Sequence, residues 1–323
     1  MTYIVDIWDA LSVKYLNINE ISSFRRIKIE KKYNYVALIK KRIFSDLWQR
    51  MKNFGEMKCP FIDLIDGPFI RIDRKCAIKP SKAIKTARLI ARNSGFDILI
   101  NNDIFFNENQ NKLKRYLIAH ELGHTFLFNT EIYPIKPLFS NNDNFHVESE
   151  IRNSIWKEEE DFSFEIGRYI LAPTEYLPQV IPKEPSIQAF IDGLENFQIA
   201  DEILGKRLFQ DTYNWKNGES YWNDASLIIF KNHHSGQLSD ECQYFHGTNY
   251  LEKIRDNYQL QSEIQSILCE IYPCDPNKKF QKNIDMNGLN WHIEILFPFT
   301  DSDGYILITP RLTEKNYTQT TLF

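Results

Sequence analysis

The sequence predicts an α+β protein with a helical N-terminal part and a separate α+β C-terminal domain. Apolar residues recur at helical spacing over residues 6–16 and 35–54, whereas short β-rich runs occur within residues 217–323. The chain has 323 residues, of which 43% are hydrophobic and 25% charged, a balance typical of folded globular proteins. This length favours more than one domain.

Residues 1–55 are predicted to form a basic helical N-terminal part. Residues 1–92 hold 20 Lys and Arg against 9 Asp and Glu, while residues 93–323 hold 19 against 34. The net charge of −4 is therefore the sum of a basic N-terminal part and an acidic remainder of the chain. This asymmetry predicts either internal electrostatic docking or an anionic partner such as a nucleic acid. A solvated helix face is the third interpretation, and no DNA-reading motif is present in this stretch.

Short elements are predicted over the next forty or so residues. A turn at Asp66-Gly67-Pro68 precedes a predicted strand, Phe69–Ile72. Pro80 is predicted to open a helix that runs to about Asn93. The runs Phe96–Ile100 and Ile104–Phe106 predict two further strands, separated by a turn.

A longer helix follows, with a predicted cap at Asn109 or Asn111. One buried stripe at three-and-four spacing is expected along it, made of Leu113, Tyr116, Leu117, His120, His124 and Leu127. The two histidines of this stripe are therefore expected to point inward, toward the strands.

Within this helix, residues 120–124 read His-Glu-Leu-Gly-His. Two histidines one turn apart project from the same face and can bind one zinc ion, and Glu121 beside the metal can act on a bound water. Histidine is scarce, with 7 in 323 residues, so a chance match is expected in on the order of one such chain in a hundred. The alternative is a pair of histidines with ordinary hydrogen bonds.

A catalytic zinc site needs a third protein ligand and an open fourth position. The stretch Trp156–Pro173 predicts a helix with an acidic start, and its small residues Ser163 and Gly167 allow close packing on another helix. A carboxylate near the start of this helix could be the third ligand, although acidic residues also favour a helix N-terminus by themselves. The candidates are Glu148, Glu150, Glu158, Glu159 and Glu160.

These two motifs resemble those of the ImmA/IrrE family of gluzincin-like zinc metallopeptidases, over roughly residues 65–180. The family's second helix typically reads Glu-x-x-Ala-Asn-x-Phe-Ala-Ala-x-Leu-Leu-Met-Pro. Alignment on Pro173 places its leading Glu on Glu160 and its Ala on Ser163. The chain departs from the family at Phe164, where Asn or Asp is usual, and at Ala172, where Met is usual.

The resemblance implies a zincin-like core in which His120, His124 and Glu160 hold Zn²⁺ and Glu121 is the general base. It implies limited, regulated proteolysis of a specific protein partner, such as a transcriptional repressor or a stress or defence regulator. The alternative is a catalytically silent protein of this fold that binds a protein or nucleic acid. The expected oxyanion stabiliser has two candidates, His146 and Tyr169, and a structural role also explains each of them.

Four segments are expected: the basic helical segment (residues 1–55), a zinc metallopeptidase core (residues 56–182), a helical linker module (residues 183–216) and an α+β domain (residues 217–323). Some members of the resembled family carry a GAF-like sensory domain at the last position, so a regulatory role is expected there by analogy. The linker module could be a helix-turn-helix, but its only cations are Lys206 and Arg207, which does not favour DNA reading.

The composition also predicts a cytoplasmic protein. Five scattered cysteines indicate reduced thiols rather than a disulfide framework. The first residues contain no basic and apolar leader, and no stretch approaches the roughly 18 apolar residues of a membrane helix. No membrane partner is therefore expected.

Overall fold

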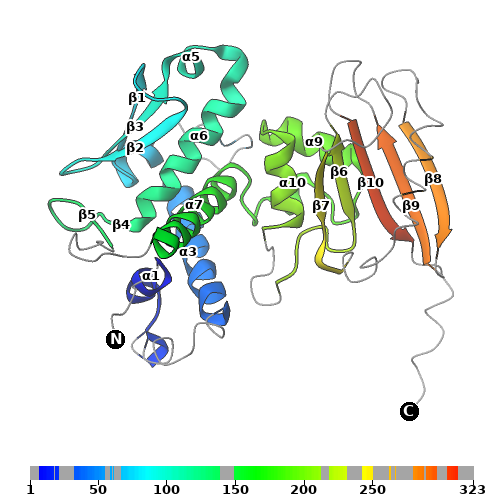
Figure 1. Cartoon of the computed structure of the whole chain (residues 1–323), viewed down its shortest axis with the longest axis horizontal. Coiled ribbons are helices and arrows are strands. Elements are labelled where there is room, and N and C mark those ends of the chain that lie inside the picture. The colour runs from blue at the N-terminus through cyan, green and yellow to red at the C-terminus, as the bar shows by residue number, and fades with distance from the viewer. Residues whose placement is uncertain are drawn as a thin grey trace. The chain divides into compact units, whose positions relative to one another are not determined.

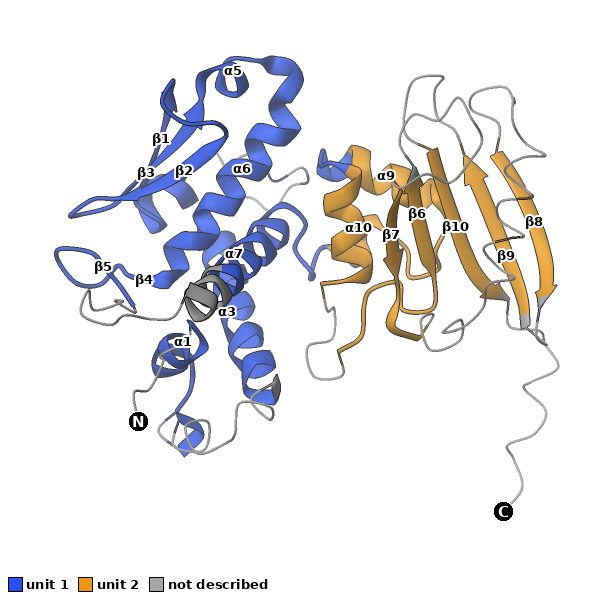
Figure 2. Cartoon of the chain, in the orientation of Figure 1, with its two compact units in different colours: residues 1–176, 196–200 blue, residues 177–195, 201–323 orange. Residues whose placement is uncertain are grey.

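The computed structural model confirms an α+β fold with a helical N-terminal region and an antiparallel sheet in the C-terminal region (Figure 1). It forms two compact units (Figure 2): unit 1 comprises residues 1–176 and 196–200, and unit 2 comprises residues 177–195 and 201–323. The four-segment division of the chain stays a prediction. The structure describes residues 7–17, 19–21, 33–54, 59, 61, 67–138, 149–211, 218–230, 242–249, 262, 266, 279–286, 289–296 and 304–311.

Unit 1 begins with the two predicted helices, α1 (Ile7–Tyr15) and α3 (Tyr33–Phe54). Helix α3 is amphipathic, because apolar residues at i, i+4, i+8 and i+12 fall on one buried stripe. These residues are Ile39, Ile43, Leu47 and Met51.

Several cations of α3 form ion pairs within unit 1. Lys40 lies 2.5 Å from Glu165, and Arg42 lies 2.7 Å from Glu20. Arg50 also contacts Asp73 at 3.0 Å. The charges of these three cations are therefore paired with acidic residues of the same unit.

A three-stranded sheet follows, made of β1 (Cys76–Ser81), β2 (Ala87–Ala91) and β3 (Phe96–Asn101). The strand order is β1-β3-β2, with β1 parallel and β2 antiparallel to β3. Strand β3 is central and buries Phe96, Ile98 and Ile100, and β2 lies at one edge of the sheet. The predicted strand at 96–100 is confirmed.

The helix predicted from Pro80 to Asn93 is wrong, because this segment completes β1 and forms β2. Its apolar residues match helical spacing, but a short apolar run cannot be assigned to helix or strand by periodicity alone. Pairing with β3 makes this segment a strand, as the register Leu89↔Ile98 shows. Local propensity does not predict such long-range pairing.

The two flanking strands predicted around this sheet are also wrong. Residues Phe69–Asp73 form a π-helical turn, η2, that follows Pro68. Residues Asn102–Phe105 form a short helix, α5, whose first turn is capped by the Asn101 side chain accepting from the Asp103 N–H. A side-chain cap of this kind competes with extended structure and ends the strand.

Helix α6 (Asn111–His124) carries the histidine motif and continues into a 3₁₀ turn, η4 (Thr125–Leu127). The predicted caps are wrong, because Gln110 is the N-cap residue and its side chain makes no capping bond. Asn107 instead caps the preceding 3₁₀ turn, η3 (Glu108–Gln110). A short ribbon, β4 (Phe128–Asn129) with β5 (Lys136–Pro137), follows η4.

The predicted buried stripe of α6 is correct only in part. Leu113 is 43% exposed, because the helix begins only two residues earlier and its first turn is exposed. The buried residues of α6 are Arg115, Ile118, Ala119, His120, Glu121, Leu122 and Gly123.

Helix α7 (Ser149–Leu171) starts earlier than predicted and ends before Pro173 as predicted. It packs directly on α6 through small residues. A Cβ atom on Gly123 would lie 2.4 Å from the Ser163 carbonyl oxygen, and one on Gly167 would lie 2.9 Å from the His120 nitrogen. The two backbones therefore touch at two points, which confirms the predicted close approach.

Unit 2 contains three helices in its described residues and one five-stranded antiparallel sheet of order β7-β6-β10-β9-β8. The sequence of this region predicts strands at 225–230, 291–297 and 305–309, and these are confirmed as β6, β9 and β10. The sequence also predicts helical patterns at 251–258 and 263–272, which lie outside the described residues apart from position 266. The elements are α8 (Leu177–Val180), α9 (Ile187–Phe197), α10 (Asp201–Phe209), β6 (Ser226–Phe230), β7 (Gln243–His246), β8 (Lys279–Met286), β9 (Leu289–Leu296) and β10 (Gly304–Arg311).

Both cations of α10 are engaged in ion pairs. Lys206 pairs with Glu202 at 2.6 Å, and Arg207, only 1% exposed, pairs with Asp211 at 3.3 Å.

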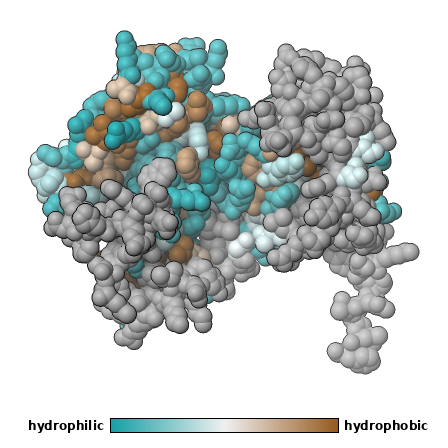
Figure 3. Space-filling view, in the orientation of Figure 1, coloured by the Kyte–Doolittle hydropathy of each residue, from teal (hydrophilic) through white to brown (hydrophobic). Residues whose placement is uncertain are grey.

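The visible face of unit 1 mixes hydrophilic with hydrophobic residues (Figure 3). Within the described ranges, no helix combines the length and the apolar character needed to cross a membrane.

Candidate metal centre

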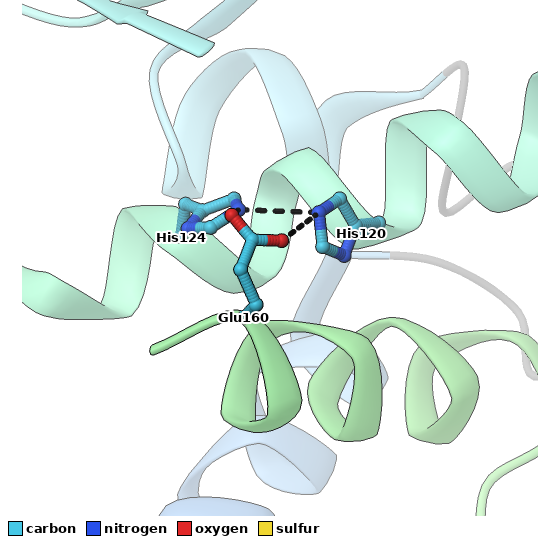
Figure 4. Close-up of side chains that lie close together, drawn as sticks. All are labelled: His120, His124 and Glu160. Atoms are coloured by element: carbon cyan, nitrogen blue, oxygen red, sulfur yellow. Dashed lines mark hydrogen bonds and ion pairs between the residues drawn. The ribbon is translucent and has the colours of Figure 1, made fainter. Parts of the chain in front are cut away.

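Helices α6 and α7 bring three side chains together where they cross (Figure 4). The Nε2 atoms of His120 and His124 lie 3.2 Å apart. One carboxylate oxygen of Glu160 lies 3.3 Å from the first nitrogen, and the other lies 3.6 Å from the second. The one-turn spacing of the histidines and the close packing of α7 together create this group.

The geometry of this group suits zinc. In a tetrahedral site with metal–ligand distances of about 2.0–2.1 Å, the ligand atoms lie about 3.3 Å from one another. The spacing between the two nitrogens and the spacings from each nitrogen to its nearer Glu160 oxygen fall close to that value, and the ligand atoms that the three residues offer all lie within 4.8 Å of one another. Two imidazoles and one carboxylate are also a known ligand set of catalytic zinc. Among the described residues, His120, His124 and Glu160 are the one group of three or more His, Cys, Asp or Glu that could hold a metal ion.

His124 is oriented by hydrogen bonding from α7. The Ser163 hydroxyl lies 3.0 Å from its Nδ1 atom, and a Glu159 carboxylate oxygen lies 3.5 Å from the same atom. Both contacts reach the ring nitrogen that does not face His120. Such contacts fix the orientation of a ligand histidine and leave Nε2 for the metal.

His120 is oriented by stacking instead. Its ring centroid lies 4.0 Å from that of Phe164, at an interplanar angle of 32°, and Tyr116 stacks on the Phe164 ring at 6.0 Å. The Nδ1 atom of His120 is buried and has no hydrogen-bond partner among the described residues. Phe164 occupies the position where the resembled family usually has Asn or Asp, so an aromatic face replaces a polar side chain here.

The two histidines have opposite pKa shifts. Burial, reinforced by His124 and Arg168, lowers the pKa of His120 to about 3, so this ring stays neutral. Burial by itself would also lower the pKa of His124, but the hydrogen bond that the ring donates to Glu159 and the charges of Glu121 and Glu160 outweigh it and raise that pKa. The neutral ring is the form that binds metal.

Glu121 lies beside the metal group, and a backbone hydrogen bond from the edge strand β2 holds its side chain. It is 6% exposed, and burial is the main cause of its raised pKa. The Leu89 backbone N–H donates a hydrogen bond to its carboxylate, and the neighbouring Arg88 acts on it electrostatically. The site therefore contains a carboxylate that takes up a proton more readily than an exposed one.

The other candidates for the third ligand do not join the group. Glu159 contacts the Nδ1 side of His124, and Glu158 does not belong to the cluster. Glu148 lies outside the described residues, as does the side chain of Glu150.

Of the two candidates for oxyanion stabilisation, Tyr169 is engaged in contacts of a structural kind. Its hydroxyl donates to the Glu175 carboxylate at 2.5 Å and lies 3.2 Å from the Phe44 carbonyl oxygen, and its side chain is fully buried. The structural interpretation of Tyr169 is therefore the one that its contacts support. His146 lies outside the described residues.

Sequence reasoning missed a buried arginine that supports the end of α6. The Arg74 guanidinium donates to the Thr125 hydroxyl oxygen at 2.7 and 2.9 Å and lies over the Phe126 ring. The Thr125 hydroxyl in turn donates to the Leu122 carbonyl oxygen at 2.6 Å. These contacts hold the turn that directly follows His124, and no local pattern links residues so far apart in sequence.

The chain matches no protein-family model and no curated protein. Its function is therefore inferred from the geometry of the site and from the two sequence motifs.

Proposed function

We propose that this protein is a zinc-dependent endopeptidase of the gluzincin type, similar to the ImmA/IrrE family. The observation that carries the proposal is the group of His120, His124 and Glu160 with the buried carboxylate of Glu121 directly beside it. A structural zinc site is normally closed by four protein ligands, whereas a catalytic site has three and leaves one position open. Three ligands and an adjacent base fit the catalytic type.

In this proposal His120 and His124 bind the metal through Nε2, and Glu160 binds through its carboxylate. Bound zinc supplies Lewis-acid chemistry, because it polarises the scissile carbonyl and acidifies water. Glu121 takes up the proton of the attacking water and later delivers it to the leaving amine. Burial favours the protonated form of this carboxyl group, and the Leu89 N–H holds it in place.

The edge of strand β2 supports a peptide as the substrate. The Asn101 N–H donates to the Thr86 carbonyl oxygen, and the Arg92 N–H donates to the Gly95 carbonyl oxygen. Since backbone groups alternate in direction along an antiparallel strand, residues 87, 89 and 91 direct theirs away from β3. An extended segment can add to such an edge as a further strand, and there it would lie beside Glu121.

We further propose that the substrate is a specific protein partner, such as a transcriptional repressor or a stress or defence regulator, cut at few sites. Residues 217–323 would carry the regulatory signal. A five-stranded antiparallel sheet joined to helices is compatible with the GAF-like sensory domain that the resemblance implies. The free thiols of Cys59 and Cys76 support a reducing, cytoplasmic location.

The second candidate is a catalytically silent regulator of the same fold that binds a protein or a nucleic acid. One observation favours it: the Nδ1 atom of His120 lacks a hydrogen-bond partner among the described residues. Ligand histidines usually donate this second N–H to an acceptor, and loss of such a partner weakens metal binding.

The substitution Glu121→Gln separates the two functions. Zinc-loaded wild-type chain should release new N-termini from a mixture of native cellular proteins, detected by mass spectrometry. The variant should keep its zinc and lose activity by roughly 10²- to 10⁴-fold, since general-base catalysis contributes about that much. The variant Glu108→Gln, at an exposed position, is the matched control. Equal cleavage by Glu121→Gln would contradict the general-base role of Glu121. Absence of cleavage by the zinc-loaded wild type would overturn the endopeptidase proposal and favour the silent regulator instead.

A further inference from the structure

The segment that contains β1 and β2 is strongly cationic. Residues 75–92 hold six Lys and Arg and no Asp or Glu. Two of these cations are neutralised within the sheet, because Lys79 and Arg92 both pair with Asp97, at 2.7 and 2.8 Å. A third, Lys75, donates to the Thr130 carbonyl oxygen at 3.3 Å.

The other three cations are Lys82, Lys85 and Arg88, here called the cationic strip. All three side chains are exposed. The Arg88 backbone pairs with Leu99 of β3, but none of the three side chains forms a hydrogen bond or ion pair with another residue that the structure describes. Arg88 lies on β2 itself, while Lys82 and Lys85 lie on the connection that leads into β2.

The cationic strip is adjacent to the proposed catalytic group. Arg88 immediately precedes Leu89, whose backbone N–H reaches the Glu121 carboxylate, and Arg88 also acts on that carboxylate electrostatically. A segment that lies along the outer edge of β2 would therefore pass Glu121 and continue toward Lys85 and Lys82. Helix α7 carries an acidic run, Glu158–Asp161, which includes the candidate ligand Glu160.

We propose that the cationic strip selects protein substrates that carry an acidic segment on one flank of the cleaved bond. This inference rests on the proposed endopeptidase function and names the substrate class. Charge complementarity between the strip and carboxylates steers association and determines the register of binding. Because Lys82 and Lys85 precede β2 in the chain, the strip lies toward the N-terminal end of that strand, and the preference is one-sided.

An acidic peptide fits this surface better than a nucleic acid does. The outer edge of β2 offers backbone N–H and C=O groups at the spacing of an extended peptide. A nucleic acid strand has no backbone N–H and C=O groups that match this edge. The occupant is therefore an acidic, extended segment of the protein substrate.

A binding experiment tests this without depending on cleavage. The probe is a labelled synthetic peptide in which Glu and Thr alternate, added to the zinc-loaded full chain carrying Glu121→Gln. A peptide of alternating Lys and Thr and an oligothymidylate are compared with it by fluorescence anisotropy. The Glu-containing peptide should bind roughly tenfold more tightly than the Lys-containing one, and added salt should weaken its binding.

Charge reversal identifies the surface. The double variant Lys82→Glu, Lys85→Glu should invert the preference, so that the Lys-containing peptide binds more tightly. The matched control Lys41→Glu, Lys52→Glu makes the same change in net charge at exposed positions of α3 and should leave the preference unchanged. Equal binding of both peptides, equal loss in the control, or tighter binding of oligothymidylate would overturn the proposal. Failure of the endopeptidase function would appear separately, as absence of cleavage by wild type.

Discussion

Gly123 lies against the backbone of Ser163 so closely that a Cβ atom on Gly123 would come within 2.4 Å of the Ser163 carbonyl oxygen. This contact lies one residue before His124 and three residues after Glu160. It therefore determines how far the carboxylate on α7 stands from the imidazoles on α6. In the His-Glu-Leu-Gly-His motif, the histidines are the candidate ligands, and the glycine allows α7 to approach closely enough for Glu160 to join them.

Replacing this glycine should disrupt the metal group. Gly123→Ala forces α6 and α7 apart, because a backbone oxygen cannot move aside as a flexible side chain can. We expect zinc affinity to fall at least tenfold, with a stability loss of about 1–3 kcal/mol. Chelator competition and urea unfolding measure the two effects.

The control for this variant is Gly193→Ala in unit 2. The added methyl group there meets only the side-chain ends of Ile181 and Leu204. This variant can lose stability but should bind zinc as wild type does. Wild-type zinc affinity in Gly123→Ala would show that the close contact does not position the ligands.

Ser163 should contribute to zinc affinity through His124. Ser163→Ala removes the hydroxyl that lies 3.0 Å from the Nδ1 atom, and loss of such a partner typically costs 10–100-fold in metal affinity. Chelator competition gives the zinc dissociation constant, and circular dichroism reports the fold. A matched control is Ser226→Ala, which removes a similar contact to His246 in unit 2 and should leave zinc binding unchanged.

The sequence motifs predicted the helices of the candidate site but not the contacts that hold it. The spacing of His120 and His124 is a local property, so it can be seen in five residues. The contact of Ser163 with His124 joins two helices that are 39 residues apart along the chain. Ser163 is predictable as a small packing residue, and its hydroxyl acquires a second role only when the helices cross.

Strand β2 shows the opposite case, in which a local pattern is misleading. Its apolar residues match a helix, yet pairing with β3 places Leu89 in a strand. The hydrogen bond from the Leu89 N–H to Glu121 therefore could not be predicted, since it depends on a free sheet edge beside α6. Long-range pairing also explains why the contact of Arg74 with Thr125 had no sequence signal.

Two neighbouring carboxylates on α7 should behave differently. Glu160→Gln replaces the carboxylate that faces both Nε2 atoms with a neutral amide, and we expect the purified variant to contain little zinc. Glu159→Gln changes only a contact on the Nδ1 side of His124 and should keep its zinc, bound more weakly. Metal analysis of both variants decides the matter. Full zinc content in Glu160→Gln together with its loss in Glu159→Gln would make Glu159 the ligand.

Glu294 should stabilise unit 2 in a pH-dependent way. Its carboxylate accepts from the Ile187 N–H at 2.8 Å and from Gln281 and Lys279 at 3.1 Å each. Burial by itself would raise its pKa, but these contacts outweigh it and hold the pKa below the ordinary value. The carboxylate therefore stabilises the fold above the ordinary Glu pKa, and this contribution is lost as the pH falls through the lowered pKa.

The variant Glu294→Gln should accordingly unfold more easily at neutral pH, by about 1–3 kcal/mol. The difference from wild type should shrink as the pH falls below about 4. Urea unfolding of both proteins at neutral and acidic pH measures this, with Glu195→Gln, at an exposed position of α9, as the control. A difference that stays constant across this range would show that the charge of Glu294 does not contribute.

Metal analysis of the full chain tests the central claim most directly. The protein is purified without exposure to chelators, and its zinc content is compared with that of His124→Ala. We predict one zinc ion per wild-type chain and almost none in the variant. A wild-type content well below one zinc per chain, or an equal content in His124→Ala, would contradict the proposed metal centre.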